Sequence, residues 1–232
     1  MRKWLKRIAV IIVMALTIPA LVYHFGLRGW CLRWGTTGPE AHASLPGDEL
    51  FPVYAGEATH AITIHATPDK IWPWLMQIGQ DRSGFYSYTF IENAFGCDMP
   101  KVERLVPEWK PRGRGETVWF CDPKRFNGQG KMVPAVVETD RAFAMVSPAD
   151  WRSVESGGRA HDGFWSFTIQ PQATGESRLI ARVRSGVPPT LTARLMGRLF
   201  WEPAHFVMEQ KMLRTIRDLA EHSGSEVRNR NL

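Results

Sequence analysis

Residues 60–79 read HAITIHATPDKIWPWLMQIG, and this stretch decides the fold class because a strand pattern leads directly into a helix start. Polar and apolar residues alternate from His60 to His65, which is the period of a β-strand. Thr67 suits the cap of a helix, and Pro68 and Asp69 suit its first turn. The pattern predicts a strand followed by a helix that ends at Gly79.

Further strand patterns follow in a series typical of an antiparallel sheet. They are predicted at 116–121, 131–138, 141–147, 162–170 and 177–185. In the last of these, three apolar residues alternate with Arg178, Arg182 and Arg184, which predicts one buried face and one solvated face.

Helices are predicted on either side of this series. A short helix is expected from Tyr88 to Phe95, and a long helical region follows Pro188-Pro189-Thr190, with a break or kink at Pro203. The order of elements predicts an α+β domain in which helices pack on one face of a curved antiparallel sheet. Such a sheet around a long helix can leave space for a ligand.

The N-terminus carries an apolar run from Ile8 to Tyr23 that reaches about 20 residues when extended to Leu27, near the ~30 Å of a bilayer core. This predicts a membrane-spanning anchor within residues 1–34. A cleaved signal peptide is the alternative, but no small-residue cleavage site closely follows the apolar run. Residues 35–57 are predicted to be a linker, 58–222 the folded domain and 223–232 a polar, frayed tail.

The net charge of +6 does not indicate nucleic-acid binding. Residues 1–35 contain six basic residues and no acid, so the other 23 basic residues are balanced by 23 acidic ones. A nucleic-acid-binding domain concentrates its positive charge on the folded part. Four basic residues precede the apolar run and Arg28 and Arg33 follow it, which predicts a single-pass topology with the domain outside the cytoplasm.

The three cysteines leave the compartment open. Cys97 and Cys121 could form a disulfide in an oxidising compartment, with Cys31 left near the bilayer, or all three could be buried thiols. No Cys/His spacing predicts a metal site. No phosphate-binding loop, dinucleotide fingerprint or nucleophile elbow is present, so no cofactor is expected.

The chain resembles bacterial members of the SRPBCC superfamily, which includes START-type lipid-transfer domains and polyketide cyclase/dehydrase-like proteins. The likeness rests on residues 61–64, 71–75, 77–80, 84–88, 92–93, 104–109 and 206–213, and it spans roughly residues 45–222. It implies a helix-grip fold with a hydrophobic cavity between the sheet and the C-terminal helix. It implies no reaction, because the superfamily mixes binders, carriers and enzymes.

The chain departs from that pattern in three respects. Thr89 stands where relatives tend to have an acidic residue, Ser83 stands where they have a second glycine, and six strands are predicted where the fold usually has seven. The missing acid weakens the assignment of a general base near the second helix.

The candidate site residues are those expected to face this cavity. Tyr86, Tyr88 and Glu92 would orient a ligand from the rim; alternatively, the aromatic residues seal the helices against the sheet, and Glu92 caps a helix or pairs with an arginine. His205 follows Pro203 on the helix that the resemblance places along the cavity, where it could bind a ligand or transfer a proton, or simply bond a freed carbonyl. Trp165, Phe167, Met208 and Met212 would supply the apolar wall.

These observations predict a membrane-tethered domain that binds or handles a hydrophobic small molecule or lipid. The alternative is a cyclase/dehydrase-type enzyme that uses Tyr86, Glu92 or His205 as acid or base. A third possibility is an interaction protein whose cavity is filled. The expected partners are therefore an apolar ligand and a membrane.

Overall fold

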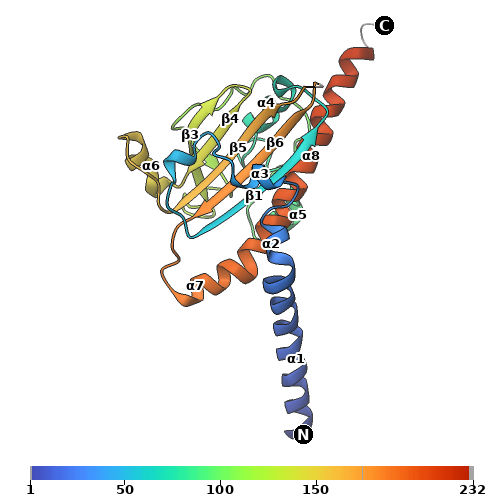
Figure 1. Cartoon of the computed structure of the whole chain (residues 1–232), viewed down its shortest axis with the longest axis vertical. Helices are drawn as coiled ribbons and strands as arrows, with labels where there is room; N and C mark the ends of the chain where they lie inside the picture. Colours follow the sequence, from blue (N-terminus) through green and yellow to red (C-terminus); the bar gives the residue numbers. More distant parts are fainter. Residues whose placement is uncertain (1, 174, 230–232) are drawn as a thin grey trace.

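Six antiparallel strands form one curved sheet in the order β1-β6-β5-β4-β3-β2 (Figure 1). The computed structural model describes residues 2–173 and 175–229. The strands are β1 (Gly56–Ile64), β2 (Val118–Trp119), β3 (Lys131–Glu138), β4 (Ala142–Val146), β5 (Gly163–Pro171) and β6 (Ser177–Ser185). Each lies within three or four residues of its predicted bounds, and the predicted α+β class is confirmed.

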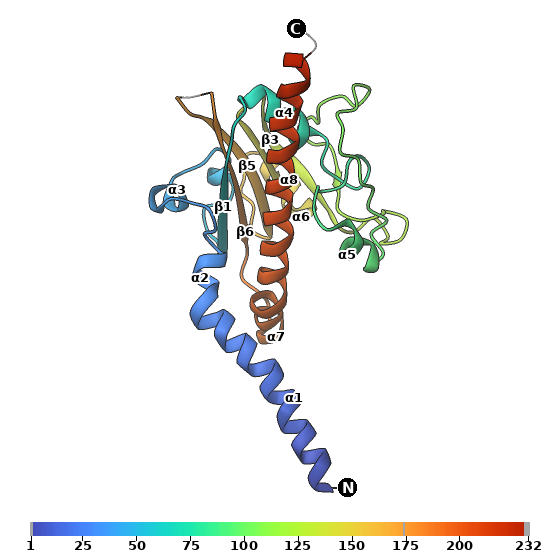
Figure 2. The ribbon, with the colours of Figure 1, turned by 90° about the vertical axis from the view of Figure 1, so that its right-hand side faces the viewer.

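The long helix α8 (Glu202–Asn229) lies along the concave face of the sheet, so the predicted helix-grip arrangement is present (Figure 2). It packs against β1 and against α4 (Pro68–Met76). The main core lies between these layers and includes Ile64, Phe143, Phe167, Leu179 and Ile216, all fully buried. Burial of such side chains contributes about 1.5–3 kcal/mol each, which fixes α8 on this face.

A break was predicted at Pro203, and just before this residue the helix changes from α-helical to π-helical and back. α7 (Leu191–Met196) begins at Thr190, whose hydroxyl accepts from the Ala193 amide, and the π-helical turn η3 (Gly197–Trp201) joins it to α8. Pro203 therefore stands in the first turn of α8, directly after the π-helical turn, where the Glu202 amide donates to the Gly197 carbonyl. Backbone helix continues to Asn229; the side chains of the predicted tail, and all of residues 230–232, lie outside the described residues.

The outer face of β6 is covered rather than solvated, contrary to the prediction. Arg182 is 1% exposed; it donates to Thr59 and to the Ala43 carbonyl and pairs with Asp48. Arg178 pairs with Glu40 at 2.8 Å. Opposite charges arriving from another segment allow these arginines to be buried, and the strand pattern alone does not reveal that segment.

The covering segment is the stretch 35–57 that was predicted to be a linker. It forms α3 (Gly38–His42), which Thr37 and Glu40 cap reciprocally, and the short 3₁₀ turn η2 (Asp48–Leu50). Phe51 is fully buried against Phe164. Two shorter helices complete the domain, α5 (Thr89–Ala94) near its predicted place and α6 (Pro148–Glu155), which was not predicted.

The N-terminal helix α1 (Arg2–Val22) projects away from the sheet and is joined to it by the π-helical turn η1 (Tyr23–Leu27) and by α2 (Arg28–Cys31) (Figures 1 and 2). The prediction of a membrane-spanning helix finds no support: among the described residues, no helix is long and apolar enough to cross a bilayer. The basic residues Arg2 to Arg7 belong to α1 itself, and the apolar part that follows, Ile8 to Val22, is about 22 Å long at 1.5 Å per residue.

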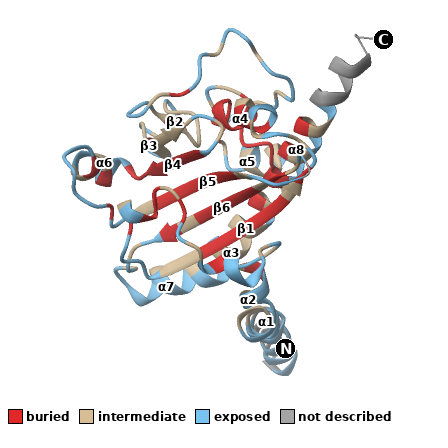
Figure 3. Cartoon of the chain, turned by 45° about the horizontal axis from the view of Figure 1, so that its top comes forward, coloured by how far each residue is buried: buried red, intermediate tan, exposed pale blue. Residues whose placement is uncertain are grey.

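Cys97 and Cys121 form a disulfide, which resolves the alternative left open by the sequence. Cys31 is a buried free thiol. Figure 3 shows the buried strands of the domain beside the largely exposed surfaces of α1 and α7.

Candidate functional site

A cavity of about 540 Å³ lies between α8 and the ends of β5 and β6. The loop and helix before Cys97 close one side of it, and the β2–β3 region closes another. Most of its lining is apolar, from Phe85, Phe120, Met132, Trp165, Val183, Trp201, Met208 and Met212. Its polar groups are few, and include Ser87, Glu92, His205 and Glu209.

Five of the predicted site residues line this cavity, namely Glu92, Trp165, His205, Met208 and Met212. Tyr86 does not: it is buried, and its hydroxyl donates to the Trp74 carbonyl at 3.2 Å. Tyr88 lies beside Phe90, and Phe167 lies in the core behind Trp165. A binding role for the five remains a prediction.

The backbone explains why Phe85, rather than Tyr86, reaches the cavity. Gly84 and Tyr86 both have positive φ, 76° and 56°, so the chain turns sharply around Phe85. A side chain added at Gly84 would meet the Pro100 carbonyl oxygen at 2.4 Å, so only glycine fits there. The turn sends the Phe85 ring against Phe120 and Trp165, at centroid distances of 4.9 and 5.8 Å.

A buried charge cluster underlies the helical wall of the cavity. Glu209, 1% exposed, accepts from the Trp165 indole at 2.6 Å on Oε1, and His60 Nδ1 contacts its Oε2. The other nitrogen of His60 lies 2.8 Å from the Cys31 carbonyl oxygen. His205 Nε2 lies 3.3 Å from Glu209 Oε1, and 32% of the His205 side chain is exposed.

The proton positions in this cluster follow from the partners. A carbonyl oxygen can only accept hydrogen bonds, so His60 Nε2 donates to the Cys31 carbonyl oxygen while Nδ1 faces Glu209. Burial alone would raise the pKa of Glu209, but the charges of His205 and His60 and their hydrogen bonds outweigh burial and hold that pKa far below its usual range. Glu209 is therefore a buried anion with compensating donors on three sides.

His205 is the histidine of this cluster that faces the cavity. Burial lowers the pKa of its imidazole, but the charge of Glu209, whose Oε1 lies 3.3 Å from Nε2, prevails, so the pKa is raised above 6.5. Its ring lies parallel to that of His60 at 6.3 Å. A histidine held by a carboxylate in this way can donate or accept a proton near neutral pH.

Glu92 presents a second titratable group to the same cavity. Ser87 donates to its Oε1 at 2.6 Å, while Oε2 is buried with no hydrogen-bond partner in the described part of the chain. Burial raises the pKa of this carboxyl, an effect that the hydrogen bond from Ser87 only partly offsets. In its neutral form Glu92 can donate a hydrogen bond to a polar group of a ligand.

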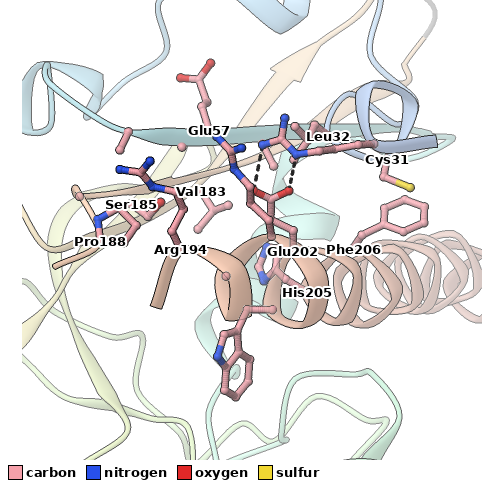
Figure 4. A pocket seen from close by; sticks show the side chains of 18 of the residues that line it. Cys31, Leu32, Glu57, Val183, Ser185, Pro188, Arg194, Glu202, His205 and Phe206 are labelled. Carbon is pink, nitrogen blue, oxygen red and sulfur yellow. Dashed lines mark hydrogen bonds and ion pairs between the residues drawn. The ribbon is translucent and has the colours of Figure 1, made fainter. Parts of the chain in front are cut away.

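A second hollow, of about 570 Å³, lies on the other side of His205 (Figure 4). It is bounded by α2, by the neighbouring ends of β1 and β6, and by the stretch from α7 to the start of α8. Val183, Ser185, Trp201 and His205 border both hollows. The second hollow therefore lies directly beside the apolar cavity, and we call it the entrance hollow.

The sequence interpretation missed Glu209 and His60 as site residues. The available signal was the spacing of His205 and Glu209, four residues apart on one face of a helix that is otherwise apolar there. His60 gave no signal, because its partners lie on α2 and α8, far away in sequence. Across residues 2–173 and 175–229, no group of three or more His, Cys, Asp and Glu residues is arranged to hold a metal ion.

The sequence matches no protein-family model and no curated protein. Among solved structures, a Polyketide_cyc-like protein from Corynebacterium glutamicum is similar at 13% identity and a TM-score of 0.35, over 74% of this chain and 93% of that one. CalC, a self-sacrificing resistance protein from Micromonospora echinospora, is similar at 9% identity and a TM-score of 0.40, over 74% and 97%. At these scores the likeness gives no argument about function.

Proposed function

We propose that this protein binds an apolar small molecule or lipid in the cavity between α8 and the sheet. The observation that carries the proposal is the cavity itself: its volume is about 540 Å³ and apolar side chains dominate its wall. Ligand sites usually measure about 300–1,000 Å³, with an apolar lining and a few orienting polar groups. Ser87, Glu92 and His205 supply such groups here.

The composition of the helical wall supports an adaptable site. Met208 and Met212 lie one turn apart on α8 and both face the cavity. Methionine is flexible and polarizable, so it fits irregular apolar shapes. The Cys97–Cys121 disulfide ties the loop that follows α5 to the segment just after β2, and Cys121 itself lines the cavity.

A change that fills the cavity tests the proposal. Met208 is only partly buried, so Met208→Trp should place an indole in the cavity without breaking the core. Full-length protein in nanodiscs is exposed to a photoreactive fatty acid, and the crosslinked peptides are mapped by mass spectrometry. Peptides that carry cavity residues should be labelled in the wild type, and their labelling should fall at least tenfold in Met208→Trp.

Val207→Trp is the matched control, because Val207 is the next residue on the same helix and is 44% exposed. It should leave the cavity labelling unchanged. If the wild type is labelled only on α1, or if both variants behave alike, the cavity is not a ligand site. Both variants should unfold cooperatively, since neither side chain is in the main core.

A second candidate function is acid–base catalysis on a ligand in the same cavity. His205, held by Glu209, would be the base and neutral Glu92 the acid, because both face the cavity. Ligands that co-purify with wild-type protein and with a His205→Gln/Glu92→Gln variant should then differ chemically, by the mass of one water for a dehydration. Identical ligands from both proteins would favour binding alone.

We also propose that the chain works at a lipid surface outside the cytoplasm. Exposed apolar residues on α1, among them Ile11, Ile18 and Leu21, support contact with lipid, and the basic residues of its first turns support contact with anionic headgroups. The Cys97–Cys121 disulfide supports an oxidising compartment.

A further inference from the structure

The entrance hollow carries an excess of positive charge that the apolar cavity does not need. Three arginines border it: Arg28, Arg194 and Arg198. Glu202 accepts from Arg28 at 2.7 and 2.9 Å, so this pair is neutral. The other acid of the hollow, Glu57, is paired with Arg184 at 2.7 Å.

Arg194 and Arg198 therefore remain uncompensated. Both are exposed, and neither has an acidic partner among the described residues. They lie four residues apart across the junction of α7 and η3, and both residues line the same hollow. Figure 4 shows Arg194 and His205 rising from the helical wall toward β1 and β6. Two guanidinium groups that share a hollow suit a carboxylate or a phosphate.

The entrance hollow also lies directly beside the apolar cavity. Val183, Ser185, Trp201 and His205 line both, so a molecule that occupied the two adjacent spaces would be elongated. Its apolar body would lie among Met208, Met212 and Trp165, and its charged end beside Arg194 and Arg198. A ligand without a charged end would leave the two arginines without an anionic partner.

Building on the proposed function, we infer that the ligand is an amphiphile with a single anionic headgroup, held at the entrance by Arg194 and Arg198 while its apolar chain fills the cavity. Two sources share this chemistry: a fatty acid, whose head is a carboxylate, and a lysophospholipid-like phosphate monoester. The entrance lies at the end of the domain from which α1 projects (Figure 1). A lipid surface in contact with α1 would therefore present such molecules close to the entrance.

The test compares three photoreactive probes with one acyl chain: a fatty acid, its phosphate monoester, and the neutral alcohol. Full-length protein in neutral phosphatidylcholine nanodiscs is labelled with each, and cavity crosslinks are quantified. The anionic probes should label the cavity about tenfold more than the alcohol, a preference worth about 1.4 kcal/mol. The probe that labels best distinguishes carboxylate from phosphate.

Arg194→Gln/Arg198→Gln should lower labelling by the anionic probes to the level of the alcohol, and should leave the alcohol unchanged. Arg152→Gln/Arg159→Gln removes the same charge from exposed positions in and after α6 and should change nothing. The preference of the wild type for the anionic probes over the alcohol should decrease as salt is added, because both arginines are exposed and salt screens their charges.

Two results would overturn the inference and leave the cavity proposal standing. One is equal cavity labelling by the anionic and neutral probes in the wild type. The other is a loss of anionic-vesicle binding in Arg194→Gln/Arg198→Gln with cavity labelling unchanged, which would assign the arginines to the bilayer surface. Absence of cavity crosslinks with every probe would instead refute the binding function itself.

Discussion

A buried carboxylate is stable only if its charge is compensated, and Glu209 is compensated by residues from three different elements. His60 comes from β1, Trp165 from β5, and His205 from its own helix one turn earlier. Removing one member of such a cluster leaves the others buried and unpaired. At the residue scale, Glu209 therefore both fastens α8 to the sheet and sets the protonation of the histidine that faces the cavity.

Glu209→Gln should lower the free energy of unfolding by about 3 kcal/mol at neutral pH, because it leaves His60 without its anion. The measurement is urea unfolding of the full chain followed by circular dichroism. The substituted glutamine keeps the shape of the side chain, so packing alone does not account for a loss of this size. Asp218→Asn, at an exposed position on the same helix, serves as the control and should cost less than about 0.5 kcal/mol.

The same cluster gives stability a definite pH dependence. The native pKa of Glu209 is depressed, so its contribution is present above its ordinary pKa of 4.5 and is lost as the pH falls below that value. The native pKa of His205 is raised, so its contribution is present below 6.5 and is lost as the pH rises through its native pKa. Unfolding free energy should be greatest between about pH 4.5 and 6.5, and Glu209→Gln should flatten both slopes. Equal slopes in the two proteins would contradict this assignment.

At the element scale, periodicity predicted the strands and helices well. An element that is buried on one face repeats its apolar residues with the period of a strand or of a helix. The strands of the sheet, α4, α5 and the break before α8 all lie close to their predicted places. The outer face of β6 was mispredicted, since Arg182 and its partner Asp48 are 134 residues apart and each looks solvated on its own. For the same reason residues 35–57 read as a linker and His60 as a residue without a partner.

The candidate site could be predicted only in part. The apolar residues Trp165, Met208 and Met212 follow from their spacing on β5 and α8, and they face the cavity as expected. Phe85 faces the cavity where Tyr86 was predicted to do so, because the positive φ values at positions 84 and 86 redirect the loop, and sequence periodicity does not describe such a turn. Glu209 was missed because its burial depends on long-range partners.

The Cys97–Cys121 disulfide links two of these segments covalently, and the effect of its removal on stability can be measured. Cys97 and Cys121 are 24 residues apart, and a loop of this length stabilises the native state by about 3 kcal/mol. Reduction by dithiothreitol should therefore lower the Tm by roughly 6–12 °C for a domain of this size. In Cys97→Ser/Cys121→Ser the Tm should already be lowered, and the reductant should have no further effect. An unchanged Tm on reduction would show that the two thiols are not bonded in solution.

At the scale of the whole molecule, the entrance hollow, α7 and α1 lie at one end, and the C-terminal end of α8 lies at the other (Figure 2). α7 and η3 expose Leu191, Leu195, Met196 and Trp201 there, and Val187 precedes them. Exposed apolar side chains gathered at one end of a molecule mark an interaction surface. A lipid surface that contacts α1 would thus meet the end of the domain that carries the entrance hollow.

The last prediction concerns this lipid contact. Full-length protein should float with vesicles of phosphatidylcholine that contain about 30% anionic lipid, because basic residues near the surface contribute about 1 kcal/mol each and α1 adds apolar contact. Ile11→Asp/Ile18→Asp places two charges on exposed apolar positions of α1 and should reduce the floated fraction at least tenfold. Phe90→Asp, at a position 72% exposed on α5, is the control and should float as the wild type does. If all three proteins float equally, the lipid contact is not made by α1 and lies elsewhere, for instance on α7. If the wild type does not float, the apolar residues of α1 contact another partner.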